Sequence, residues 1–114
     1  MKNKVYSVEG SNISPLPDLL EKQFKLSRMS VSNTAKTLLF VSEKYSFIQN
    51  SDMACIIFVD IISENKCILN FIVAGVNAGL LRLDLFNREE SAINDFNEAL
   101  QKMCVDNGWK SNSS

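Results

Sequence analysis

Few side chains in this chain have types and spacings that could perform chemistry. The chain has no histidine, which is the side chain most used for proton transfer near neutral pH and the commonest metal ligand. Its three cysteines, Cys55, Cys67 and Cys104, form no C-x-x-C pair and lie within apolar stretches. A reactive thiol needs a basic neighbour and a zinc site needs further ligands, and this pattern supplies neither. The cysteines are therefore predicted to be buried, reduced and structural, as is typical of a reducing compartment.

A glycine-bounded segment and a few charged pairs are the remaining candidates for a site. Residues 75–79 (GVNAG) are expected to join two strands and not to open a helix, so they indicate a turn and not a phosphate-binding loop. Arg82 and Asp84 would share one face of a strand, where such a pair is usually a surface ion pair. The adjacent Glu43 and Lys44 would point to opposite faces. The sequence thus predicts no catalytic residue, no cofactor site and no metal site, and we expect a protein that is not an enzyme.

Length and charge favour one globular domain without a nucleic-acid or membrane partner. The chain has 114 residues, near the commonest domain size, and we expect a domain over residues 1–109 and a disordered polar tail over 110–114. Twelve basic and thirteen acidic residues give a net charge of −1 without a basic cluster, which disfavours nucleic-acid binding. No apolar run approaches the roughly 18 residues of a membrane span or follows the N-terminus as in a secretory signal. A cytoplasmic location is the expectation.

Apolar patterning predicts an α+β fold, an antiparallel meander of about four to five strands with two helices on one face. Ser14 is expected to cap the first helix, and Asn87 is expected to cap the second, which would stop at Asn107-Gly108. The edge of the sheet that the first strand joins is left open. The expected order is β-α-β-β-β-β-α, with strands over 3–8, 36–48, 53–62, 67–74 and 80–86 and with helices over about 14–28 and 87–107.

The three last strands of this scheme are apolar on both faces or nearly so. Successive side chains of a strand alternate between faces, so helices on one side cover only half of them. Odd positions are the stronger core candidates: Cys55, Ile57, Val59, Ile61, Leu69, Phe71, Val73, Leu81, Leu83 and Leu85. The even positions form a second apolar face with polar interruptions, and its candidate interface or ligand residues are Ile56, Phe58, Asp60, Asn70, Ile72, Arg82, Asp84 and Phe86.

Several covers for this second face are consistent with the sequence. A water-exposed apolar face of this extent would exceed the few hundred Å² usual for a soluble monomer. The first strand or residues 27–33 could hide it from within, or two copies could pair through it as a homodimer. Another protein or a small apolar ligand could also cover it, with Asp60, Asn70, Arg82 and Asp84 as polar anchors or as simple solubilising groups. An inhibitor or immunity-type protein is a further, weaker hypothesis for so small an acidic chain.

Three short segments resemble a known family. Residues 40–47 (FVSEKYSF), 74–80 (AGVNAGL) and 88–91 (REES), with two strands between the first and second, resemble an uncharacterised family of small bacterial proteins. The similarity spans roughly residues 5–103. It implies a bacterial cytoplasmic protein with a domain of unknown function, and it implies no reaction, substrate or functional residue.

Overall fold

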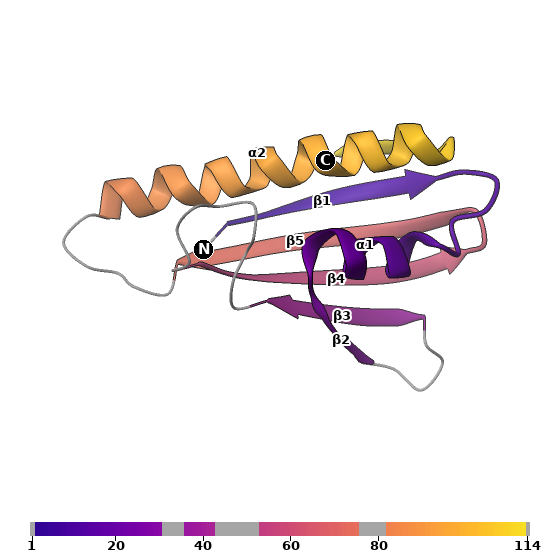
Figure 1. The fold of residues 1–114 in the computed structure, drawn as a ribbon, viewed down its shortest axis with the longest axis horizontal. Helices are drawn as coiled ribbons and strands as arrows, with labels where there is room; N and C mark the ends of the chain where they lie inside the picture. Colours follow the sequence, from indigo (N-terminus) through magenta and orange to yellow (C-terminus); the bar gives the residue numbers. More distant parts are fainter. Residues whose placement is uncertain (1, 31–35, 43–52, 76–81, 114) are drawn as a thin grey trace.

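The structure, a computed structural model, describes residues 2–30, 36–42, 53–75 and 82–113. These residues form two helices and one antiparallel sheet of six strands in the order β2-β3-β4-β5-β1-β6 (Figure 1). The α+β class predicted from the sequence is confirmed, with a sheet wider than expected. The elements in chain order are β1 (Lys2–Glu9), α1 (Leu16–Phe24), β2 (Ser27–Ser30), β3 (Thr37–Ser42), β4 (Met53–Ser63), β5 (Lys66–Gly75), α2 (Arg82–Asn107) and β6 (Lys110–Ser113).

The centre of the sheet is the hairpin of β4 and β5, which the sequence predicted. Its two long strands pair from Met53 opposite Gly75 to Ser63 opposite Lys66, with a β-bulge between Ile61 and Ser63. β-Branched and aromatic residues dominate both strands, which suits a pleated and mostly buried surface. The odd positions face the helices as expected, and the buried ones are Cys55, Ile57, Val59, Cys67, Leu69, Phe71 and Val73.

The first strand lies inside the sheet, which answers the question that the sequence left open. β1 pairs with β5 along its whole length, from Lys2 opposite Val73 to Glu9 opposite Lys66, and it pairs with β6 on its other side. The position beside β5 is therefore occupied, and the strand predicted over 80–86 is wrong. Residues from Arg82 onward belong to α2. Leucine fills four of the seven positions 80–86 and none of the seven is β-branched, so the intrinsic preference of this segment already favoured a helix.

Both helix starts differ from the predicted ones. Pro15 is the N-cap of α1 and makes no side-chain cap bond, while the Ser14 N–H donates to Asn12 Oδ1 at 3.1 Å, so Ser14 is not the cap. The helix ends at Phe24 because Lys25 takes a left-handed conformation with φ 53°. Because α2 begins at Arg82, Asn87 lies inside the helix and does not cap it.

The predicted stop of α2 is confirmed, and it creates an unpredicted strand. Gly108 has a φ of +74°, and the Trp109 N–H donates to the Cys104 carbonyl at 2.7 Å, which closes the helix. The chain then reverses, and β6 pairs with β1. The disordered tail expected over 110–114 is therefore replaced by a strand over Lys110–Ser113, and a second short edge strand, β2, stands where an irregular segment was expected.

The core lies between the two helices and one face of the sheet. Phe96 of α2 is at its centre, stacked on Phe71 of β5 with ring centroids 4.2 Å apart and planes 4° apart. Phe24 of α1 and Tyr6 of β1 contact the same ring at 5.0 Å and 5.5 Å. Four elements thus meet at one aromatic cluster, and both helices are fixed to the same face of the sheet.

Three expectations concern residues outside the described ranges. They are the second half of the strand predicted over 36–48, the turn over 49–52, and the turn from residue 76 to residue 79. The first half of that strand is confirmed as β3.

Candidate functional site

The candidate site is the face of the sheet opposite the two helices, which we call the open face. Strand pairing places its side chains in three rows that cross the strands. The first row is Met29, Leu39, Phe58, Asn70 and Val5, the second is Ser27, Val41, Ile56, Ile72 and Asn3, and the third is Thr37, Asp60, Ile68 and Ser7.

The first two rows form a continuous apolar surface across the middle of the sheet. Phe58 and Ile56 of β4 lie between Leu39 and Val41 of β3 and the side chains of β5. These central side chains are only partly buried, although Phe40, Ile57 and Phe71 on the helix side of the same strands are fully buried. Met29, on the edge strand β2, is 54% exposed. Among the described residues, both helices pack on the opposite face of the sheet, and no helix packs on this one.

Four polar residues of the open face are paired within the chain. Thr37 Oγ1 donates to Asp60 Oδ1 at 2.8 Å between β3 and β4. Asn3 Nδ2 donates to Asn70 Oδ1 at 3.1 Å between β1 and β5. Such cross-strand pairs fix register and reduce the need of these groups for an outside partner. Asp60 and Asn70 therefore form hydrogen bonds within the sheet. Of the two roles considered from the sequence, polar anchor and solubilising group, this arrangement is closer to the second.

Five of the eight residues proposed from the sequence come together on this face: Ile56, Phe58, Asp60, Asn70 and Ile72. The other three do not. Arg82, Asp84 and Phe86 belong to α2 and not to a fourth strand of the meander, so their assignment to the face is corrected. The error follows from the strand predicted over 80–86, whose place beside β5 is taken by β1.

Other residues of the open face were missed because their strands were assigned less fully. Val5 lies beside Asn70, and Leu39 and Val41 lie beside Phe58 and Ile56. The alternation of apolar residues at 39 and 41 was a usable signal, since it has the period of a strand. Met29 had no such signal, because the four residues of β2 are otherwise polar or charged.

The three thiols that were predicted to be structural lie in the protein interior. Cys55, Cys67 and Cys104 are buried and form no disulfide. Burial raises the pKa of Cys55 and of Cys67 to about 12, with a smaller contribution from Cys104 at Cys67. Burial also raises the pKa of Cys104, and the neighbouring Ser111 side chain offsets part of this. At neutral pH the thiols are protonated, and a protonated thiol is a poor nucleophile.

Two further features are absent from the described residues. In those ranges no group of three or more cysteine or carboxylate side chains gathers as a set of metal ligands. No helix there is long and apolar enough to cross a membrane.

Comparisons of the chain with protein-family models, with curated proteins and with solved structures found no match. The resemblance to a family of small bacterial proteins stays a prediction.

Proposed function

We propose that the protein is a non-enzymatic module that self-associates through the open face, with the same face of a second copy as its partner. The observation that supports this proposal is the pair of adjacent apolar rows, which cross the sheet on the side that the helices leave uncovered. Two copies related by a two-fold axis would cover these rows at once.

A second copy suits the chemistry of this face better than a charged partner does. The described residues place few charges on it: Asp60, which accepts a hydrogen bond from the neutral Thr37 hydroxyl, and Glu9, which lies 3.6 Å from Lys66 at the end of the sheet. A strongly charged partner would find little opposite charge to neutralise. An apolar sheet face is matched by another, because two such faces pack about 10 Å apart with interdigitated side chains.

The area of the open face sets the expected strength of the association. Five strands about 4.8 Å apart and three rows about 6.7 Å apart span roughly 24 Å by 20 Å. This footprint of about 480 Å² is smaller than the roughly 800 Å² per partner of a standard interface. We therefore expect a reversible dimer whose population depends on protein concentration.

The same reasoning extends to location and origin. We propose a cytoplasmic protein, and the support is three buried cysteines that stay unpaired, as is usual in a reducing compartment. A bacterial origin is proposed only on the resemblance of the segments at 40–47, 74–80 and 88–91.

The test is the solution mass of the wild type and of two matched variants, by size-exclusion chromatography with light scattering under reducing conditions. Phe58→Lys places a charge in the first row of the open face, where a dimer would bury it. Val105→Lys makes a comparable exchange on α2, where the side chain is 75% exposed. We expect the wild type and Val105→Lys to approach twice the chain mass of 12.8 kDa as concentration rises, and Phe58→Lys to stay monomeric.

Two results would contradict the proposal. One is a wild type that stays monomeric at every concentration. The other is a dimer that Phe58→Lys leaves intact, which would point to pairing through the edge strands β2 and β6. Urea unfolding of each variant confirms that Phe58→Lys is folded, since a cooperative transition separates loss of association from loss of structure.

A further inference from the structure

On the helix side of the sheet, away from the open face, an apolar pocket of about 180 Å³ opens where α1 meets the end of the β4–β5 hairpin. Ile13 and, in α1, Leu16 and Pro17 form one wall, and Val59, Ile61 and Cys67 of the hairpin form the other. Leu16, Val59 and Cys67 are fully buried, so they form the floor. The apolar ligand considered from the sequence would lie on the even positions of the strands, whereas the residues of β4 and β5 that line this pocket, Val59, Ile61, Ser63 and Cys67, are odd positions.

Backbone hydrogen bonds and a β-bulge border the pocket at the turn of the hairpin. The Ile13 N–H donates to the Glu64 carbonyl at 2.9 Å, and the Gly10 N–H donates to the Asn65 carbonyl at 2.9 Å, so the segment that leads into α1 is tied to the hairpin turn. The β-bulge after Ile61 bends β4 at the same place. Bulges of this kind often redirect side chains beside binding sites.

Volume and lining define the class of occupant. An apolar cavity of about 150 Å³ stays dry and accepts a molecule such as benzene, because water finds too few hydrogen-bond partners in it. This pocket is slightly larger and its floor offers no strong polar group, so it suits an alkyl or aryl group of about six to eight non-hydrogen atoms. Exposed Ser14, Ser63 and Glu64 complete the lining, so the polar groups lie at the mouth.

We propose that this pocket binds a small amphiphile with a compact apolar body and a positively charged end. The body lies against Leu16, Val59 and Cys67, and the charged end lies at the mouth beside the Glu64 carboxylate. That carboxylate is the one charged group among the residues that line the pocket. An ion pair at such an exposed position is worth up to about 1 kcal/mol, so Glu64 adjusts selectivity while the apolar body supplies most of the affinity.

The test uses three probes of equal chain length, hexylamine, hexanol and hexanoate, followed by methyl NMR. Saturable shifts are expected for the methyl groups of Ile13, Leu16, Val59 and Ile61. Hexylamine should bind more tightly than hexanol by up to about fivefold and hexanoate should bind most weakly. Glu64→Gln should remove the preference for the amine and keep the binding of hexanol.

Two pocket variants and one control locate the binding. Ile61→Phe fills the pocket and should abolish the shifts, whereas Ile62→Phe makes the same exchange one residue later, at a position 59% exposed, and should preserve them. Ser14→Trp covers the mouth from an exposed position, which keeps the test valid if Ile61→Phe does not fold. The proposal is overturned if none of the probes gives saturable shifts, if the shifts persist in both pocket variants, or if hexanoate binds as tightly as hexylamine.

Discussion

Trp109 packs directly against Gly10, near the two ends of the described chain. The indole Nε1 of Trp109 donates to the Asn12 carbonyl at 2.9 Å, and its ring lies directly against Gly10. A Cβ at Gly10 would lie 2.2 Å from Trp109 Cδ1, which is far inside van der Waals contact. The contact joins the residues after β1 to the residue before β6, so one side chain helps to fix both elements.

We predict that Gly10→Ala destabilises the protein by about 1–3 kcal/mol, as overpacking of a filled site does. The added methyl group must displace the indole and strain its hydrogen bond. Urea unfolding measures the loss. Trp109→Leu alone is also destabilising, but Gly10→Ala on the Trp109→Leu background should cost much less than on the wild type, because the clashing ring is gone.

Gly108→Ala is the matched control for this coupling. The Gly108 backbone has a φ of +74°, and a Cβ there would contact nothing within 4 Å. The expected cost is about 1 kcal/mol from backbone conformation alone, and Trp109→Leu should not reduce it. Equal costs of Gly10→Ala with and without Trp109 would contradict the proposed contact.

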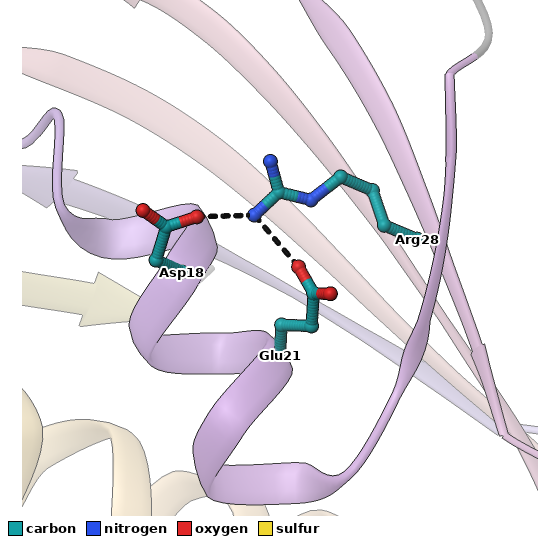
Figure 2. A network of polar contacts seen from close by, with 3 residues as sticks. All are labelled: Asp18, Glu21 and Arg28. Atoms are coloured by element: carbon teal, nitrogen blue, oxygen red, sulfur yellow. Dashed lines mark hydrogen bonds and ion pairs between the residues drawn. The ribbon is translucent and has the colours of Figure 1, made fainter.

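Among the elements, α1 is short and depends on its side chains for its position. Arg28 of β2 contacts two carboxylates of this helix, Asp18 at 2.6 Å and Glu21 at 2.8 Å (Figure 2). The guanidinium also lies 5.4 Å from the ring centroid of Phe40. One arginine thus joins the helix to the edge of the sheet. The two carboxylates are 82% and 42% exposed, so water and salt weaken the attraction.

We predict that Arg28→Met lowers the free energy of unfolding by about 0.5–1 kcal/mol at low ionic strength, the upper part of the range for exposed ion pairs. Methionine keeps an apolar stem beside Phe40 and removes the charge. The difference from wild type should shrink in high salt, as measured by thermal unfolding at two salt concentrations. Lys22→Met, a charge removal at an exposed position of the same helix, is the control and should have a smaller effect. A loss for Arg28→Met that salt does not change would assign its role to packing.

For the whole molecule, the buried core contains several ionisable groups that stay neutral at physiological pH. Burial raises the pKa of Tyr6 and of two thiols to about 12, and it raises the pKa of Cys104 as well. In the unfolded chain a thiol has a pKa near 8.5. Above that pH the unfolded state loses protons that the folded state keeps, so the unfolded state is stabilised.

The titration of these groups should therefore leave the free energy of unfolding constant below about pH 8.5. It should lower that free energy from pH 8.5 toward pH 12. Cys55 and Cys67 each contribute a slope that approaches about 1.4 kcal/mol per pH unit in that window. Urea unfolding at a series of pH values measures the slope. Cys55→Ala should reduce the slope with which the free energy of unfolding falls. The packing cost of the variant is the same at every pH and does not change this slope. A stability that is unchanged between pH 7 and pH 11 would contradict the burial of these groups.

The predicted and observed folds agree where local pattern alone decides the structure. The β4–β5 hairpin follows from two long β-rich runs joined by a short polar turn, and the alternation within each run determines which residues face the helices. The end of α2 at Asn107-Gly108 follows in the same way from the freedom of glycine at positive φ. Five residues of the open face were predicted for the same reason, since they belong to these two strands.

Only the tertiary structure decided which strands are neighbours. A strand signal does not specify its partner, and pairing depends on which edge is free when the chain folds. β1 took the place beside β5, residues from Arg82 onward became helix, and Arg82, Asp84 and Phe86 were removed from the face. β6, four polar residues without an apolar pattern, exists because Gly108 and Trp109 set the chain beside β1. The sequence by itself thus determined that the sheet has two apolar faces, and the tertiary structure decided which residues share them, because strand pairing is a long-range choice.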